Sequence, residues 1–304
     1  MLFPGQGSQF VGMGHSLYQA SATAKNLFHQ AEEILEMPLR SLCFEGPATD
    51  LTDTRIAQPA ILTVSYILFQ LLKEDGIAPS WVAGHSLGEY TALLAAGAFS
   101  FEDALLLVKR RAELMSSVPG DGGMVAILNM PIADLQEEVE KLKKEGVIEL
   151  ANHNSPVQIV VSGEKSLVHK LADTVNGSKR GKAIMLAVSG AFHSPLMIPA
   201  AKELRTELDQ TAFQSLAIPL VANVTAEPVH SAGELPDLLE KQVYSPVLWE
   251  ESLRKLSDLG CHLYLEVGGK VLTGLIKKTL KGVTAHYVIE VDDLKKVLAI
   301  LKEV

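Results

Sequence analysis

The sequence is poor in cysteine. Only Cys43 and Cys261 occur among 304 residues, too few and too far apart for a disulfide framework or a thiolate metal site. A reducing compartment fits this usage. No other feature of the sequence calls for a metal or a redox group, so we expect no cofactor.

Long apolar runs are also missing. No uninterrupted apolar stretch reaches the roughly 18 residues that span a bilayer. The opening Met1-Leu2-Phe3-Pro4-Gly5 lacks the basic stretch and apolar core of a secretion signal. We therefore expect a cytoplasmic protein with no membrane partner.

Basic residues are outnumbered, with 27 Lys and Arg against 36 Asp and Glu and a net charge of −9. Such a chain repels a phosphate backbone, which argues against nucleic acid as a partner. Hydrophobic residues make up 47% and charged residues 21%, as in ordinary packed proteins. No internal repeat is present, and a monomer is the expected state.

Hydrophobic spacing predicts alternating helices and strands in the first part of the chain. Apolar residues at three- and four-residue steps indicate helices, and short apolar runs indicate strands. Ser100 is a candidate N-cap, with Asp103 in the first turn that follows. The predicted elements are a helix at 59–72, a strand at 81–83, and helices at 89–98 and 101–117.

A small separate module is predicted after the flexible segment 119–123. Its elements follow the order strand, helix, strand, strand, helix, strand, which is the order of a ferredoxin-like unit. They lie at 124–128, 132–145, 148–152, 158–162, 167–175 and 183–188. The α/β pattern resumes afterwards, with helices at 196–208 and 249–258 and strands at 219–224 and 262–267.

Ser86 lies in Gly84-His85-Ser86-Leu87-Gly88, between a predicted strand and a predicted helix. Gly-x-Ser-x-Gly at such a turn is typical of a nucleophile elbow, in which the glycines permit a tight backbone. The helix N-terminus would stabilise a developing oxyanion. The bare pattern also occurs in incidental glycine-rich turns, and it suits an esterase as well as a transferase.

A serine nucleophile needs a base, and His193 is the best candidate among nine histidines. It lies in the loop from Ser189 to Pro195, and a loop held between a glycine and a proline can present a side chain into a cleft. His85 adjoins Ser86, so its side chain is expected to point away and brace the loop. Solvated surface positions are expected for His15, His29, His169 and His230.

The chain resembles the malonyl-CoA:acyl carrier protein transacylases of fatty acid synthesis, which are related to the acyltransferase domains of polyketide synthases. The resemblance depends on several separate motifs that follow one another in the family's order along nearly the whole chain. The motifs are Phe3-Pro4-Gly5-Gln6-Gly7-Ser8-Gln9, Gln58-Pro59-Ala60, Gly84-His85-Ser86-Leu87-Gly88-Glu89-Tyr90, Arg111, Phe192-His193-Ser194-Pro195, Asn223-Val224-Thr225 and Tyr244-Ser245-Pro246-Val247-Leu248-Trp249. A set of this kind is far more specific than the elbow alone.

The resemblance implies a catalytic dyad, with Ser86 as nucleophile and His193 as general base and acid. It implies that the main-chain carbonyl of Gln242 orients the histidine, in the place of an aspartate. The implied oxyanion hole consists of the backbone amides of Gln6 and Leu87.

The resemblance also implies a substrate. Arg111 would bind the free carboxylate of a malonyl group, because a planar guanidinium can grip a carboxylate through two parallel hydrogen bonds. Phe192 would lie against the substrate α-carbon, where an extra methyl group would clash. Gln58 and Met115 are assigned to the same pocket.

The implied fold is a larger α/β-hydrolase-like domain with a mainly parallel sheet, residues 1–122 and 190–304, and an inserted ferredoxin-like α+β subdomain, residues 123–189. Two departures from the family pattern stand out. The first strand is short, and the turn at Val267-Gly268-Gly269-Lys270 lacks a proline.

The implied reaction transfers malonyl from malonyl-CoA to the phosphopantetheine thiol of acyl carrier protein. Candidate basic patches for the carrier are Lys179, Arg180 and Lys182, and Lys277, Lys278 and Lys281. A trans-acting polyketide synthase acyltransferase shares all of these motifs. An α/β-hydrolase-type thioesterase would place its histidine near the chain end, whereas more than a third of this chain follows His193. An inactive scaffold would not need Ser86, His193 and Arg111 together.

Overall fold

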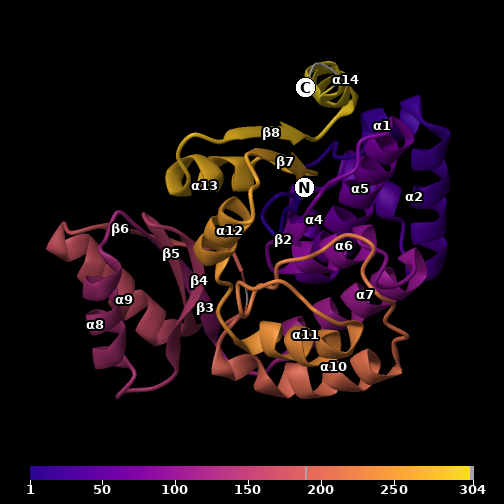
Figure 1. Cartoon of the computed structure of the whole chain (residues 1–304). Helices are drawn as coiled ribbons and strands as arrows, with labels where there is room; N and C mark the ends of the chain where they lie inside the picture. The colour runs from indigo at the N-terminus through magenta and orange to yellow at the C-terminus, as the bar shows by residue number, and fades with distance from the viewer. Residues whose placement is uncertain (189, 302–304) are drawn as a thin grey trace.

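The computed structural model describes residues 1–188 and 190–301, which form a mixed α/β fold with two separate sheets (Figure 1). One sheet has the strand order β2-β1-β7-β8 and is parallel throughout. The other has the order β4-β5-β3-β6 and is antiparallel throughout. The predicted α/β fold with a mainly parallel sheet is therefore confirmed, and the second sheet is antiparallel.

The parallel sheet consists of β1 (Leu2–Phe3), β2 (Ala83–Gly84), β7 (Leu263–Val267) and β8 (Thr284–Val288). The first strand is short, as predicted, yet it pairs with both β2 and β7 and both of its residues are buried. Helix α6 packs on β1 and β2, and α13 packs on β7 and β8. Parallel strands need such cover because both faces are apolar.

Most helices belong to this larger part of the molecule. Before the second sheet come α1 (His15–Ala20), α2 (Ala22–Leu35), α3 (Leu39–Glu45), α4 (Ala48–Leu51), α5 (Thr54–Glu74), α6 (Leu87–Ala95) and α7 (Phe101–Ser117). After it come η1 (Pro195–Met197), α10 (Ile198–Gln210), η2 (Ala232–Glu234), α11 (Leu235–Tyr244), α12 (Trp249–Asp258), α13 (Val271–Thr279) and α14 (Val291–Leu301).

Helix α5 is long and apolar enough, by length and composition, to cross a membrane, but 78% of its most apolar window is buried inside the protein. It is the core helix of the larger part. The sequence predicted its start at Pro59, a residue favoured in a first helical turn. The helix instead begins at Thr54, because the Asp53 side chain accepts a hydrogen bond from the Arg55 amide and caps it there.

The second sheet consists of β3 (Gly122–Leu128), β4 (Ile148–Ser155), β5 (Gln158–Glu164) and β6 (Lys182–Met185), with α8 (Ile132–Leu142) and α9 (Lys165–Ser178) beside it (Figure 1). The predicted order of strands and helices occurs along the chain. The last strand ends at Met185, and 186–188 line a cavity instead of extending the sheet. Ser189, the predicted end of the insert, lies outside the described residues, as do residues 302–304.

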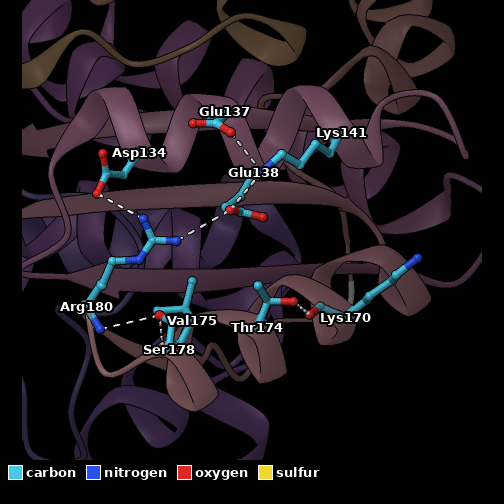
Figure 2. A network of polar contacts seen from close by, with 9 residues as sticks. All are labelled: Asp134, Glu137, Glu138, Lys141, Lys170, Thr174, Val175, Ser178 and Arg180. Carbon is cyan, nitrogen blue, oxygen red and sulfur yellow. Dashed lines mark hydrogen bonds and ion pairs between the residues drawn. The ribbon is translucent and has the colours of Figure 1, made fainter.

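Ion pairs join α8 to the end of α9 (Figure 2). Arg180, just after α9, lies 3.3 Å from Asp134 and 3.6 Å from Glu138 on α8. Lys141 pairs with the same Glu138 at 3.1 Å. Exposed pairs of this kind contribute little to stability, but they reduce the net positive charge that Arg180 offers to a partner.

Two further predicted segments differ from the structure, whereas two helices have their predicted bounds. Residues 219–224 form only isolated bridges, Val82 with Leu220 and Val221 with Pro228, so the predicted strand is wrong. Helix α6 spans Leu87–Ala95 and not 89–98. Helices α7 and α12 have their predicted bounds, and Ser100 caps α7 in a reciprocal capping box with Asp103.

Candidate active site

Ser86 occupies a tight turn between β2 and α6. Its φ of 52° and ψ of −106° lie in a sparsely populated region for a residue with a side chain. A Cβ atom at position 84 would lie 1.9 Å from the carbonyl group of Gly88, so this turn requires glycine at position 84. The constrained backbone places the hydroxyl at the head of α6.

His193 lies beside this hydroxyl, although the two residues are far apart in the chain. Its Nε2 is 2.8 Å from Ser86 Oγ, and its Nδ1 is 2.7 Å from the main-chain carbonyl oxygen of Gln242. A carbonyl only accepts, so Nδ1 carries the proton and Nε2 is left free to accept the serine proton. No carboxylate contacts the ring within the described residues, and the arrangement is a dyad.

Burial and the positive charge of Arg111 lower the pKa of His193 to about 3. The imidazole is 3% exposed. It is therefore neutral across the physiological pH range, which is the form that a general base requires.

Arg111 contributes a buried cation whose hydrogen-bond partners, among the described residues, are all neutral. Its Nη2 donates to Ser86 Oγ at 3.0 Å and to Gln242 Oε1 at 3.1 Å, and its Nη1 donates to Gln58 Oε1 at 2.8 Å. The guanidinium lies over the Tyr90 ring, and its Nε has no partner among the described residues. Burial lowers the pKa of Arg111. A buried charge without a bonded counter-ion is costly, and a bound carboxylate would neutralise it.

Two backbone N–H groups remain free to bind an oxyanion. Neither the Gln6 nor the Leu87 amide donates to a protein acceptor within residues 1–188 and 190–301. Both residues line the same cavity as Ser86. The Ser86 amide is occupied, since it donates to Asn223 Oδ1 at 2.7 Å.

The acyl transferase domain family matches residues 1–296 of the chain. The chain belongs to this family. It is 46% identical to the malonyl CoA-acyl carrier protein transacylase of Bacillus subtilis (strain 168), over 99% of this chain and 96% of that protein.

Solved structures agree with this membership. The malonyl CoA-acyl carrier protein transacylase from Clostridium perfringens superposes with a TM-score of 0.94 at 37% identity, over 99% of this chain and 96% of that one. A malonyl-transacylase in complex with its type II PKS acyl-carrier protein gives a TM-score of 0.95 at 35% identity, over 99% and 98%. The resemblance to malonyl-CoA:acyl carrier protein transacylases is therefore confirmed.

The acyl transferase site opens into a cavity of about 430 Å³. Gln58, Met115 and Phe192, which the sequence assigned to the substrate pocket, all line it and are nearly fully buried. Ser86, His193 and Arg111 line it too. The structure thus brings the predicted side chains together around one cavity. Gln242 does not line this cavity, but its main-chain oxygen bonds to His193, which does.

His85 braces the turn, and it also lines the cavity that holds Ser86 and His193. Its Nε2 lies 2.7 Å from Asn154 Oδ1, and its ring makes an edge contact with Trp249. Burial lowers the pKa of His85. Sequence reasoning missed Asn154, which sits on β4 of the second sheet and thereby ties that sheet to the elbow.

Sequence reasoning also missed the roles of Glu89 and Asn223, although both lie within motifs that carried the resemblance. Each is buried and hydrogen-bonded to the elbow or to Gln242. Polarity at buried positions of an apolar helix was the signal that could have identified Glu89. Among the described residues, no cluster of three or more His, Cys, Asp or Glu side chains is arranged to hold a metal ion.

Proposed function

We propose that this acyl transferase moves a malonyl group from malonyl-CoA to the phosphopantetheine thiol of acyl carrier protein, through a malonyl ester on Ser86. The observation that carries the proposal is the buried Arg111 guanidinium, 3.0 Å from Ser86 Oγ and without a bonded counter-ion. Malonate differs from acetate by a free carboxylate at its far end. That group is an anion which could bond the guanidinium directly.

The first half-reaction begins with proton transfer from Ser86 Oγ to His193 Nε2, across a distance of 2.8 Å. The serine oxygen attacks the thioester carbonyl, and the oxyanion is held by the Gln6 and Leu87 amides. When the tetrahedral intermediate collapses, the C–S bond breaks and His193 returns the proton to the leaving coenzyme A thiolate. The product is a malonyl-serine ester.

The second half-reaction reverses these roles. His193 Nε2 takes the proton of the phosphopantetheine thiol, and the thiolate attacks the ester carbonyl. The C–O bond to Ser86 breaks, and the serine oxygen regains its proton from His193. Substrates exchange at one site in turn, so ping-pong kinetics are expected, and the reaction uses no cofactor.

Selectivity in this proposal rests on Arg111 and Phe192. The guanidinium Nη groups now held by Gln58, Gln242 and Ser86 would bind the malonyl carboxylate as a two-point pair. Phe192 lines the cavity beside His193, so a methyl branch on the malonyl α-carbon would meet its ring. Malonyl is favoured over methylmalonyl and acetyl.

The carrier protein can belong to fatty acid or to polyketide synthesis. The Bacillus subtilis relative is named for malonyl transfer to acyl carrier protein, and one structural neighbour is bound to a type II PKS carrier. A trans-acting polyketide role is therefore the second candidate. Transfer rates to one carrier from each pathway, measured with the same malonyl-enzyme, separate the two.

Hydrolysis and an inactive scaffold are less well supported. A thioesterase has no use for a buried cation beside its nucleophile, and a scaffold has no use for a neutral imidazole 2.8 Å from a serine hydroxyl. We also propose that the protein acts as a cytoplasmic monomer. A single chain supplies every residue that the proposed chemistry needs, so no second copy is required to complete the site.

We also propose a division of the chain into two domains. We take residues 123–189 as a ferredoxin-like subdomain inserted into an α/β-hydrolase-like domain of residues 1–122 and 190–304. The strand order β4-β5-β3-β6 and the two helices α8 and α9 support the first description. The strand, elbow and helix at Ser86 support the second.

The test is intact-mass spectrometry after incubation with malonyl-CoA, followed by holo acyl carrier protein. The protein should gain one malonyl group, which then moves to the carrier. Ser86→Ala should gain none. A Ser86→Ala variant that still carries covalent malonyl would refute the nucleophile assignment, and a Thr91→Ala variant serves as a buried hydroxyl control on the same helix.

A further inference from the structure

Glu89 is a buried acid that the mechanism above does not use. It lies on α6, one turn after Ser86, and is 3% exposed. Its Oε1 accepts a hydrogen bond from the Asn223 backbone amide at 3.0 Å, and its Oε2 accepts one from Gln242 Nε2 at 2.6 Å. One carboxylate therefore joins the elbow helix to two segments from the last third of the chain.

Gln242, one of those partners, contacts three parts of the active site. Its main-chain oxygen accepts from His193 Nδ1 at 2.7 Å, and its side-chain Oε1 accepts from Arg111 Nη2 at 3.1 Å. Its Nε2 donates both to Glu89 and to the Ser86 carbonyl oxygen, at 2.6 and 2.9 Å. The orientation of this amide is fixed by the carboxylate, since an amide NH2 must face an acceptor.

Asn223, the other partner, holds the strained turn. Its Oδ1 accepts from the Ser86 amide, and its Nδ2 donates to the Gly84 carbonyl oxygen, each at 2.7 Å. These two bonds clamp the backbone on both sides of His85. Glu89 fixes the backbone of Asn223 and thus the base of this clamp.

Charge also favours a carboxylate at this position. Arg111 is the cation that acts on Glu89, and the other titratable group coupled to Glu89 is the neighbouring Tyr90. Both Glu89 oxygens accept, so the ionised form satisfies every partner, whereas a protonated acid would turn a donor toward another donor. Burial raises the pKa of Glu89 to about 7, and burial raises that of Tyr90 to about 12.

We propose that Glu89 is a positioning residue whose carboxylate aligns Gln242 and Asn223, and through them the His193 base, the Ser86 elbow and the Arg111 cation. The proposal rests on the malonyl transfer proposed above. It predicts that an amide in place of the carboxylate, although nearly the same size and shape, disturbs the alignment of the active-site residues. In the Glu89→Gln variant only one side-chain oxygen remains, so the new NH2 must face either the NH2 of Gln242 or the backbone N–H of Asn223, and one of these two donors loses its acceptor.

The experiment measures the rate of malonylation of Ser86, by quenched-flow intact mass, for the full-length protein and its Glu89→Gln variant. We expect a decrease of about 100-fold, as for small misplacements of catalytic groups. Glu266→Gln is the matched control, because Glu266 is a buried glutamate that also accepts from a backbone amide, that of Thr273. It should label within about twofold of wild type.

A conservative variant that keeps the carboxylate provides a second test. Glu89→Asp retains two oxygens that can accept from Gln242 Nε2 and from the Asn223 amide, and it leaves Gln242 and Arg111 unchanged. We expect Glu89→Asp to label about tenfold faster than Glu89→Gln, which a purely structural defect would not produce. A Glu89→Asp variant no faster than Glu89→Gln contradicts the proposal, as does a Glu89→Gln variant that labels at the wild-type rate.

A pH profile of the wild-type protein is a third test, and it does not depend on whether a variant folds. The wild-type labelling rate should rise as pH increases through about 7, where Glu89 loses its proton, and at low pH it should approach the rate of Glu89→Gln. A flat wild-type profile between pH 6 and 8 would overturn the role of the carboxylate. Failure of the wild type to label at any pH would instead refute malonyl transfer itself.

Discussion

Arg111 donates a hydrogen bond from Nη2 to the Ser86 hydroxyl oxygen at 3.0 Å. The cation proposed to bind the far end of the acyl group thus touches the nucleophile when no acyl group is bound. A malonyl carboxylate would draw the guanidinium into a stronger, charge-assisted pair. It would also offset the positive charge that helps to keep the pKa of His193 low.

Arg111→Ala should slow malonyl transfer by about 100-fold, because a buried charge pair is lost. Acetyl transfer, which lacks the carboxylate, should stay within about threefold of wild type or increase. Labelling with malonyl-CoA and acetyl-CoA, read by intact mass, measures both. The adjacent Arg110 is half-buried and paired with Glu203 and Glu207, and Arg110→Ala is the control that should change neither. Equal losses for both acyl groups in Arg111→Ala would make the arginine merely structural.

His193 should make the wild type sensitive to acid. Its pKa is about 3 when folded and 6.5 in its ordinary state, so below pH 6.5 the unfolded chain binds a proton that the folded chain refuses. This contribution to stability is present above pH 6.5 and is lost as pH falls toward 3. Between pH 7 and 5 the loss is about 2 kcal/mol.

Urea unfolding of wild type and His193→Asn at pH 7 and pH 5 isolates this contribution. The free energy of unfolding of the wild type should fall by about 2 kcal/mol more than that of the variant. Equal pH dependence of the two proteins would show that the imidazole is accessible to protons in the folded state.

Gly84→Ala should prevent the elbow from closing. The new Cβ would lie 1.9 Å from backbone atoms of Gly88, which cannot move aside without breaking the turn. We expect a loss of at least about 3 kcal/mol in the free energy of unfolding, together with loss of Ser86 labelling. Gly177 on α9 is the control, because a Cβ there meets nothing within 4 Å. Gly177→Ala should stabilise the protein by about 0.5 kcal/mol.

Among the candidate basic residues, we predict that Lys182 guides the carrier protein. It lies on β6, four residues before Leu186 in the cavity wall, and makes no ion pair among the described residues, whereas Arg180 is paired (Figure 2). Lys182→Glu should raise the KM for holo carrier about tenfold, more so at low salt. Malonylation of Ser86 should be unchanged. Lys278→Glu on α13 is the comparison, and a larger effect there would move the docking patch to the C-terminal cluster.

Local chemistry explains the elements that the sequence predicted well. Helix α7 has its predicted bounds because Ser100 and Asp103 cap each other across three residues. The start of α5 was missed because the prediction depended on apolar spacing after Pro59, whereas the true cap, Asp53, lies in a polar segment. The strand predicted at 219–224 is absent. Its apolar residues are buried by packing against distant parts of the chain, and the backbone amide of Asn223 donates to Glu89 instead of to a neighbouring strand.

The sequence by itself determined the family, the elbow at Ser86, and the residues proposed for the chemistry, since these depend on motifs and on spacing along the chain. Only the tertiary structure decided how they are held. Glu89 and Asn223 are 134 positions apart, and Gln242 is 153 positions from Glu89. No local pattern encodes such contacts. They form because a buried carboxylate, amide and cation must satisfy one another once water is excluded, and only the packed fold determines which of them meet.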